Sequence, residues 1–439
     1  MCYTIGIMQT DFSSLSIPCT IQSPCGCGFC GTLQTKNIVF CSVESEEFAR
    51  CITMLAPPLA SVLLITDSYT YQASRRCFDK RLGRLSYRVK THIYPTLPCD
   101  TLRQANAVSL PEDCKLIIGL GGQTIANLVK YIAAKNQLPA AFILTSPMAS
   151  SILTPSSVLL ADGLPQTYQT ASFKTVVADV SFLMQTDRDT LAVAFADLVS
   201  HAVSLFDYQC AKLLNGEKFC GHVYQQGCDT IDHALQLVGN DTLQRTQYAL
   251  IFSMLGQRVG SSRLQGGAEV QAAHTAKMLF TYEERPLRTM GEIQFLFAQK
   301  IVALYRNFLS KGESFFVSPP DNNMRAERIE EFLGLDCKTA TKKIRPIVSS
   351  KTAQLQAYRF REYRDELLEH LLLCEMRLKS AWKTLKRLYT DDGFGMAHYL
   401  DTADAALCLA LAPDVNDKFT LLGYMKDIGV MDNYLQELV

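Results

Sequence analysis

One short segment, residues 115–131, constrains the fold of this chain more than any other. Its sequence K-L-I-I-G-L-G-G-Q-T-I-A-N-L-V-K-Y begins with an apolar run that stops at Gly119, and an apolar-periodic stretch starts at Thr124. This pattern predicts a buried strand, a glycine turn and the N-terminus of a helix. Such a junction directs unpaired backbone N–H groups and the positive end of the helix dipole at one point, which favours a phosphate.

The glycine turn is therefore predicted to bind a dinucleotide. A Cβ atom would hold the backbone away from the pyrophosphate, so the turn needs glycine. The predicted cofactor-binding residues here are Gly119, Gly121, Gly122, Gln123 and Thr124. An ordinary turn between a strand and a helix is the alternative, because a G-x-G-G pattern ends many strands.

Further apolar runs around this turn predict a parallel sheet. Residues 62–65 and 141–144 form two more predicted buried strands, and helical stretches alternate with the strands. The alternation predicts a doubly wound, Rossmann-like α/β domain over residues 41–185. Asp67 ends one strand, where an acid can bond ribose hydroxyls and would repel a 2′-phosphate, which favours NAD over NADP. A cap on the next helix is the alternative role for this carboxylate.

The rest of the chain divides into an irregular lead-in, residues 1–40, and an all-helical domain, residues 186–439. Lys plus Arg equals Asp plus Glu, 43 each, so nothing in the charge favours nucleic acid. No uninterrupted apolar stretch approaches the roughly 20 residues that span a bilayer. The first residues lack the basic n-region of a secretory signal. A soluble cytoplasmic protein without membrane or nucleic-acid partners is expected.

Most of the 16 cysteines stand singly in apolar surroundings, as buried reduced thiols do. The exception is the run Cys25-Gly26-Cys27-Gly28-Phe29-Cys30. Three thiolates this close can hold a soft metal such as zinc. The run lacks a second pair of ligands nearby downstream, so a glycine-rich surface turn is the favoured interpretation, and a redox or metal-sensing role is a third functional alternative.

A carboxylate and an imidazole lie one helical turn apart in the second half. Asp197 and His201 are spaced i and i+4 on a predicted helix, so both side chains project from one face. Such a pair suits a divalent metal, or a histidine that is oriented by its acid. His274, on another predicted helix, can converge on the pair. Satisfied polar groups at an interface between domains are the alternative.

Six segments stand in an order that resembles the sn-glycerol-1-phosphate dehydrogenases, within the superfamily of iron-containing alcohol dehydrogenases, glycerol dehydrogenases and dehydroquinate synthases. They are V-L-L-I-T-D-S-Y-T-Y at 62–71, G-L-G-G-Q-T-I-A-N-L-V-K-Y at 119–131, V-V-A-D at 176–179, N-G-E-K-F-C at 215–220, G-G-A-E-V-Q-A-A-H at 266–274 and V-N-D-K-F-T-L-L-G-Y-M-K-D-I-G-V-M-D at 415–432. The C-G-C-G-F-C run also resembles a C-x-C-G-x-x-H element of some members, with Cys30 where they have His.

The resemblance implies a dehydroquinate synthase-like fold, with a cleft between the α/β domain and the helical domain. It also implies an oxidoreductase that uses NAD or NADP to reduce dihydroxyacetone phosphate, with a divalent metal, zinc or iron, that polarises the carbonyl. The expected partners are thus a small phosphorylated or polyol substrate and, as one possibility, further copies of the same chain.

Residue by residue, the resemblance assigns Asp197 to the metal and His274 to the substrate. Thr145 and Thr154 stand where the group touches the nicotinamide cofactor. The two histidines that complete the metal site in the group are replaced by Val270 and Met290. A valine cannot ligate a metal and a thioether is a poor ligand for a hard divalent ion, so the usual site should be lost.

His201 offers partial compensation, because the iron alcohol dehydrogenases use a D-x-x-x-H pair on this helix. Two further changes fall at the cofactor and the substrate, where Asn127 and Ser150 each replace an Asp. The sequence therefore predicts either a dehydrogenase with an altered metal site, built from Asp197 and His201, or a catalytically silent nucleotide-binding relative with a regulatory or structural role.

Overall fold

The structure is a computed structural model of the chain. It describes residues 25–74, 76–95, 101–161, 163–237, 239, 241–286, 288–312, 322–335, 338, 342, 344–389 and 400–437. The first 24 residues of the predicted lead-in lie outside the described residues.

A six-stranded sheet forms the centre of the first half, in the order β1-β8-β5-β4-β2-β3, and every pair of neighbours is parallel. Its strands are β1 (Asn37–Cys41), β2 (Ser61–Asp67), β3 (Arg88–Tyr94), β4 (Cys114–Gly121), β5 (Ala140–Leu144) and β8 (Thr175–Asp179). The predicted parallel sheet is confirmed, and β2, β4 and β5 contain the three apolar runs. Residues 37–40 of the expected lead-in belong to β1, which pairs along β8 at the edge of the sheet.

Helices cover both faces of this sheet, which is why its central strands are apolar throughout. Alternate residues of β2 point to opposite faces: Val62 and Leu64 pack in one core cluster, and Leu63 and Ile65 pack in another. The helices of this half are α2 (Glu46–Thr53), α3 (Ser68–Ala73), α4 (Cys77–Arg84), α5 (Leu102–Asn106), α6 (Gln123–Lys135) and α7 (Val180–Leu183). Helices α2 and α4 contribute to the first cluster and α6 to the second.

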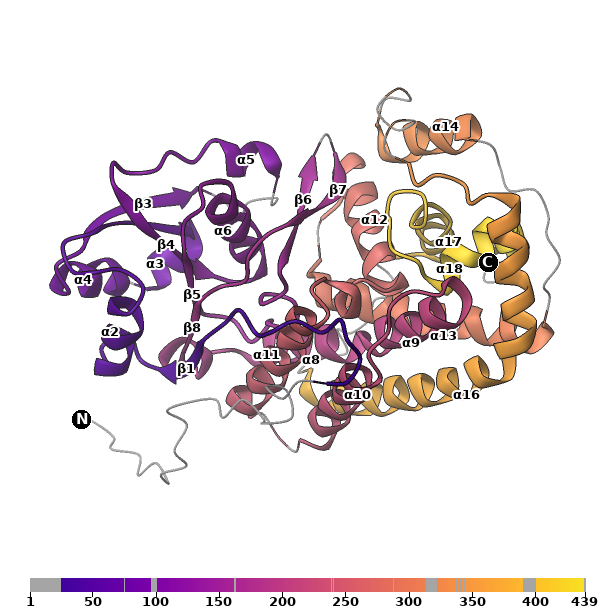
Figure 1. Cartoon of the computed structure of the whole chain (residues 1–439), viewed down its shortest axis with the longest axis horizontal. Coiled ribbons are helices and arrows are strands. Elements are labelled where there is room, and N and C mark those ends of the chain that lie inside the picture. Colours follow the sequence, from indigo (N-terminus) through magenta and orange to yellow (C-terminus); the bar gives the residue numbers. More distant parts are fainter. Residues whose placement is uncertain are drawn as a thin grey trace.

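A separate antiparallel hairpin, β6 (Ser156–Ala161) and β7 (Leu164–Gln169), follows β5. Figure 1 shows it at the junction between the sheet and the helical half. The sequence did not indicate this hairpin, because β7 alternates polar and part-buried residues without an apolar run.

After residue 179 every described element is helical, as predicted. The elements are α8 (Arg188–Ser200), α9 (Ala202–Cys210), η1 (Ala211–Asn215), α10 (Gly221–Gln236), α11 (Thr242–Arg258), η2 (Arg263–Gln265), α12 (Ala268–Tyr282), α13 (Met290–Lys311), α14 (Asn322–Leu333), α16 (Ser350–Leu388), α17 (Thr402–Leu411), α18 (Leu421–Asp427) and α19 (Met431–Gln436). They gather on one side of the sheet (Figure 1). The larger core cluster runs without a break from the sheet into this half.

One described segment, Arg188–Asn215, is long and apolar enough to cross a membrane, with a mean hydropathy of 1.4. Its most apolar window is 89% buried inside the molecule. Burial of this kind is what a central helix of a folded domain requires, so the apolar composition is explained by packing.

Candidate active-site cleft

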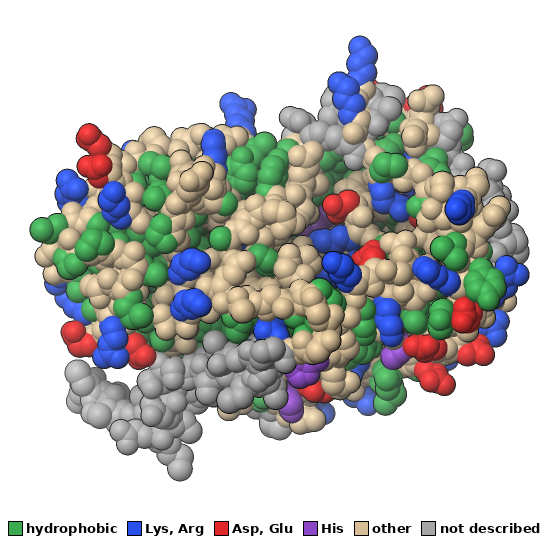
Figure 2. All heavy atoms as spheres, viewed as in Figure 1, with side chains coloured by type: hydrophobic (Ala, Val, Ile, Leu, Met, Phe, Trp, Pro, Cys, Tyr) green, Lys and Arg blue, Asp and Glu red, His purple; other side chains and the backbone are tan. Residues whose placement is uncertain are grey.

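A cavity of about 880 Å³ lies between the sheet and the helical half. Figure 2 shows charged side chains of both signs in the middle of this face, between the two halves. Eight of the residues selected from the sequence line it: Asp67, Gly122, Gln123, Thr124, Thr154, Asp197, His201 and His274. Three others, Gly119, Gly121 and Thr145, are not among the described residues that line it.

The N-terminus of α6 opens onto the cavity, as the sequence predicted for this turn. Gly122 is the N-cap residue, and no side chain caps the helix there. A Cβ atom at Gly122 would have only the Ser146 Cβ nearby, at 3.9 Å, so the backbone is accessible. Gly121 before it has φ +150°, a conformation that favours glycine. The first N–H groups of a 13-residue helix thus face the cavity, an arrangement that suits a phosphate.

Gly119 has a different role, because it is buried within β4 behind the loop. A Cβ atom there would lie 2.6 Å from Phe142 Cδ2 and 3.0 Å from Val129 Cγ2. The missing side chain lets α6 and the ring from β5 pack closely on the sheet. Gly119 therefore serves the packing behind the loop, and it does not itself line the cavity.

Asp67 combines the two roles that the sequence left open, since it lines the cavity and caps α3. Its Oδ1 accepts a hydrogen bond from the Thr70 backbone N–H at 2.8 Å, and its Oδ2 accepts one from the Thr70 hydroxyl at 2.8 Å. Each carboxylate oxygen retains a second lone pair for a ligand in the cavity.

The two threonines that the resemblance assigned to the cofactor are placed differently. The backbone N–H of Thr145 donates to the Gly121 carbonyl at 3.3 Å and so holds the glycine loop against β5. The Thr154 hydroxyl lines the cavity and donates to the Ser151 carbonyl at 2.8 Å.

Behind Thr154 lies a buried lysine that the sequence analysis did not select. Lys130 on α6 is 1% exposed, and its Nζ donates to the carbonyls of Ser156 at 2.6 Å and Thr154 at 3.1 Å. Burial lowers the pKa of Lys130 to about 7, and its hydrogen bonds to the described residues Thr154 and Ser156 reach neutral oxygens that do not offset this shift. The lysine ties α6 to the start of the β6–β7 hairpin.

The predicted metal pair forms part of a buried hydrogen-bonded chain. The Ser150 hydroxyl donates to Asp197 Oδ2 at 2.5 Å and lies 3.0 Å from His201 Nε2. On the other side of the ring, His201 Nδ1 lies 3.3 Å from Glu269 Oε1, which also accepts from Ser204. Burial raises the pKa of Asp197, although His201 and the Ser150 hydroxyl partly oppose the shift.

Two members of this chain, Ser150 and Glu269, were not recognised as a network from the sequence. At position 150 the sequence indicated only that a serine replaces an acid of the resembled group. Glu269 directly precedes Val270, which stands where that group has a histidine. Glu269 is fully buried, and its Oε2 has no hydrogen-bond partner among the described residues. The ring of His201 stacks on Phe252 with the planes 2° apart, which fixes its orientation.

This arrangement does not fit the metal that the resemblance implies. Within the described residues, Asp197, His201 and His274 do not form a group of three ligand atoms within 4.8 Å of one another. Val270 and Met290 both line the cavity. The start of α13 lies close to the aspartate, because a Cβ atom at Gly291 would be 3.0 Å from Asp197 Cβ. An apolar side chain and a thioether thus stand at the cavity where imidazoles would be needed.

The helical wall of the cavity is basic. His274 and Lys277 on α12 and Lys418 before α18 line it together. Burial lowers the pKa of His274 to about 3, and the charges of both lysines add to the shift. Burial also lowers the pKa of Lys418 to about 8, and its Nζ donates to the Ser262 hydroxyl at 2.8 Å. At neutral pH this wall therefore presents a neutral imidazole between ammonium groups.

Comparison with known proteins agrees with this architecture. Residues 47–186 match the family model of iron-containing alcohol dehydrogenases. The chain is 25% identical to a glycerol-1-phosphate dehydrogenase [NAD(P)+] of Geobacillus stearothermophilus over 61% of this chain and 69% of the relative. A second such enzyme, from Halalkalibacterium halodurans, is 25% identical over 66% of this chain and 77% of the relative. These matches support the assignment of the chain to the superfamily of iron-containing alcohol dehydrogenases.

Solved structures of this superfamily share its fold. An archaeal halo-thermophilic alcohol dehydrogenase from a Red Sea brine pool superposes with a TM-score of 0.56 at 12% identity, covering 93% of this chain and 98% of that one. Maleylacetate reductase from Agrobacterium tumefaciens gives 0.56 at 14% identity, covering 93% and 96%. At these identities the likeness concerns the fold, and any chemistry depends on the residues of this chain's own cleft.

Proposed function

We propose that this protein binds a nicotinamide dinucleotide in the cleft and acts on a small phosphorylated or polyol substrate, without the metal ion of its relatives. The observation that carries the proposal is the open N-terminus of α6 beside a basic cavity wall. Together they provide two places for negatively charged groups in one cavity.

In this proposal the backbone of Gly122 and its neighbours Gln123 and Thr124 holds the pyrophosphate. Asp67 accepts hydrogen bonds from a ribose, and Thr154 contacts the nicotinamide end. The dinucleotide, when bound, supplies or accepts a hydride. The residues around it orient the ring and exclude water.

The substrate would lie against the helical wall. Lys277 and Lys418 suit a phosphate, because each brings an ammonium group to the cavity. His274 is neutral at physiological pH, so it can accept a hydrogen bond from a substrate hydroxyl. The name of the relatives, glycerol-1-phosphate dehydrogenase, supports a substrate of this class.

The metal step is the part of the relatives' chemistry that this cleft does not support. Ser150 already bonds Asp197, and Glu269 faces the other nitrogen of His201. We therefore expect turnover of dihydroxyacetone phosphate with NADH to stay below about 1 per second, the lower end of ordinary enzymes, even with added zinc or iron. Turnover above that rate that depends on the added metal would contradict this part of the proposal.

Binding of the cofactor is tested by calorimetry with NADH and NADPH. We expect Gly122→Asp to abolish binding, because its carboxylate would face the pyrophosphate at the helix terminus. Gly83→Asp is the matched control, since Gly83 is an exposed glycine of α4 with nothing within 4 Å of an added Cβ. Absence of any binding at millimolar cofactor would end the proposal.

A second function is favoured by one observation, the replacement of four site residues. Asn127, Ser150, Val270 and Met290 stand where the group has acids and imidazoles. Dinucleotide binding without detectable hydride transfer to any polyol phosphate would identify the chain as a nucleotide-binding relative with a regulatory or structural role.

A further inference from the structure

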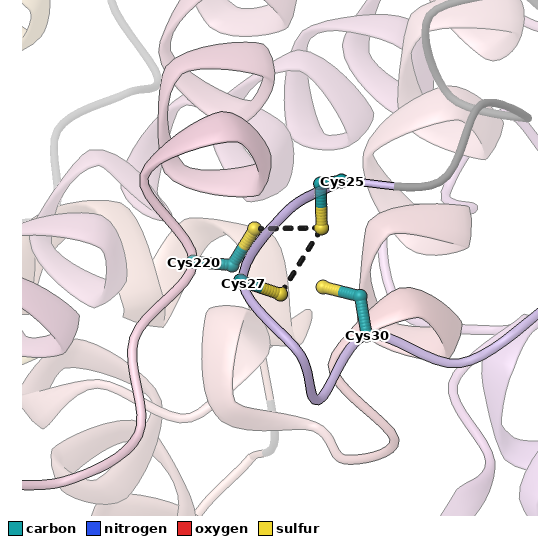
Figure 3. A group of neighbouring side chains, drawn as sticks. All are labelled: Cys25, Cys27, Cys30 and Cys220. Carbon is teal, nitrogen blue, oxygen red and sulfur yellow. Dashed lines mark hydrogen bonds between the residues drawn. The ribbon is translucent and has the colours of Figure 1, made fainter.

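Four cysteines meet at a point outside the cleft, from parts of the chain far apart in sequence. Cys25, Cys27 and Cys30 belong to the segment before β1, and Cys220 is the N-cap residue of α10. Figure 3 shows the four thiols pointing toward one another. All four sulfur atoms lie within 4.8 Å of one another, and no other such group of three or more His, Cys, Asp or Glu occurs among the described residues.

We infer that Cys25, Cys27, Cys30 and Cys220 bind one zinc ion that fastens the N-terminal segment to the helical half. Zinc prefers a closed tetrahedral set of thiolates in structural sites, with Zn–S distances of about 2.3 Å that place neighbouring sulfurs roughly 3.8 Å apart. The sulfurs of Cys25 and Cys27 are 3.1 Å apart, and those of Cys25 and Cys220 are 3.4 Å apart. Small shifts would therefore reach the tetrahedral spacing.

The surroundings of Cys220 support a thiolate at this place. The backbone N–H of Val223 donates to its sulfur at 3.4 Å, at the N-terminus of a 16-residue helix. Such an N–H bond and the helix dipole both stabilise negative charge on sulfur. The Tyr208 hydroxyl accepts from the Cys220 backbone N–H at 2.8 Å, which fixes the position of the ligand.

A single ion fits this group better than the other occupants of four cysteines. An iron–sulfur cluster inserts several iron and sulfide atoms between its ligands, and sulfurs that all lie within 4.8 Å leave too little room for them. A disulfide would join two of the thiols and give no reason for the other two to approach. The remaining alternative is a cluster of four neutral thiols without a metal, and metal analysis distinguishes it from a zinc site.

The site would hold a segment that links the two halves of the molecule. After Cys30, the Gly31 N–H donates to the Arg258 carbonyl at the end of α11, at 2.8 Å. Next, Gln257 Oε1 accepts from the backbone N–H of Gln34 at 2.8 Å and of Thr35 at 3.2 Å. The chain then enters β1 at the edge of the sheet. A metal at the start of this path anchors the segment that runs from the helices into the sheet.

The experiment is elemental analysis of the full chain, purified without chelators, with thiol titration in parallel. We expect about one zinc per chain and a closed four-sulfur coordination by X-ray absorption. The four thiols of the cluster should react with the titrant only after the zinc has been removed by a chelator. Cys25→Ser and Cys220→Ser should each lose most of this zinc. Cys228→Ser is the matched control, because Cys228 is a buried free thiol on α10 outside the cluster. It should keep the zinc.

Cys25→Ser also separates loss of metal from loss of folding. Cys25 is only half-buried on the surface segment, whereas Cys220 lies in the core. We expect the Cys25→Ser protein to remain folded while the segment around residues 25–36 becomes cleavable by protease. Wild-type protein that contains no zinc and takes up neither zinc nor cobalt, or a disulfide within the cluster, would overturn the proposal.

This inference stands apart from the cleft, and Asp197→Asn distinguishes the two. If the cysteines hold the only zinc, the metal content is unchanged in Asp197→Asn and lost in Cys220→Ser. Zinc that is lost in Asp197→Asn but kept in both cysteine variants would disprove the cysteine site and also the metal-free cleft.

Discussion

The Ser150 hydroxyl lies 2.5 Å from Asp197 Oδ2 and joins the loop after β5 to helix α8. The contact connects the sheet half to the helical half at the buried base of the cleft. A hydroxyl at this position satisfies a carboxylate that would otherwise be an unpaired charge in a desolvated place. The contact therefore stabilises the buried Asp197 carboxylate where the two halves of the molecule meet.

Removal of the hydroxyl should destabilise the protein. In Ser150→Ala, Asp197 and His201 both lose a hydrogen-bond partner, and a buried unsatisfied group costs about 1–3 kcal/mol. The measurement is urea unfolding, in which we expect a lower midpoint and an unchanged dependence of the free energy of unfolding on urea concentration. Ser151→Ala next to it is the control, and as a cavity-lining position it should change stability by less than about 0.5 kcal/mol. Equal stability of the two variants would show that the short contact contributes nothing.

Gly119 within β4 and Gly122 at the N-cap of α6 should respond differently to the same substitution. Gly119→Ala places a Cβ atom 2.6 Å from the Phe142 ring, and overpacking of this kind costs about 1–3 kcal/mol of stability. Gly122→Ala meets nothing closer than 3.9 Å, so the fold should be unaffected while NADH binding weakens. Unfolding curves and calorimetry on both variants check this, and equal loss of stability in both would refute the distinction.

The fold was largely predictable because its strongest signals are local. The apolar strands β2, β4 and β5 are buried on both faces, and each can be read from the sequence as a continuous run. The edge strand β3 reads R-V-K-T-H-I-Y, with polar residues that face solvent, so it carries no such run. Strand β1 is only five residues long, too short for a clear apolar run, and all of it except Cys41 lies in the predicted lead-in.

The site was less predictable, since its contacts join distant parts of the chain. Asp197 and His201 share one helix and could be paired by spacing, but Ser150 and Glu269 reach them only through tertiary packing. In the same way, Cys25 and Cys220 are 195 residues apart. No second ligand pair follows the C-G-C-G-F-C run closely in sequence, because a single distant cysteine at a helix N-terminus completes the group of four.

The buried Lys130 should make stability depend on pH. Its pKa is about 7 in the folded protein and 10.5 in the unfolded chain. Between these values the unfolded chain binds a proton that the folded protein does not, so this residue favours folding increasingly as the pH rises from about 7. We expect the free energy of unfolding of the wild type, relative to Lys130→Met, to increase between about pH 6.5 and about pH 9. A difference that is flat over this range would contradict the lowered pKa.

The charge of Lys418 should control anion binding in the cleft. Its pKa is lowered to about 8 by burial and by Arg263, while Asp417 opposes the shift. As the pH rises through about 8, the Lys418 ammonium loses its proton. The affinity of the wild-type protein for glycerol phosphate should therefore fall, as measured by calorimetry above the second pKa of the ligand.

The Lys418→Met protein loses one charged hydrogen bond, so it should bind glycerol phosphate about tenfold more weakly at pH 7.5. The affinity of this variant should not change with pH. Lys379→Met, on the exposed face of α16 outside the cleft, is the control and should keep the wild-type pH profile. A wild-type affinity that stays constant from pH 7.5 to about pH 9.5 would show that this lysine does not contact the anion.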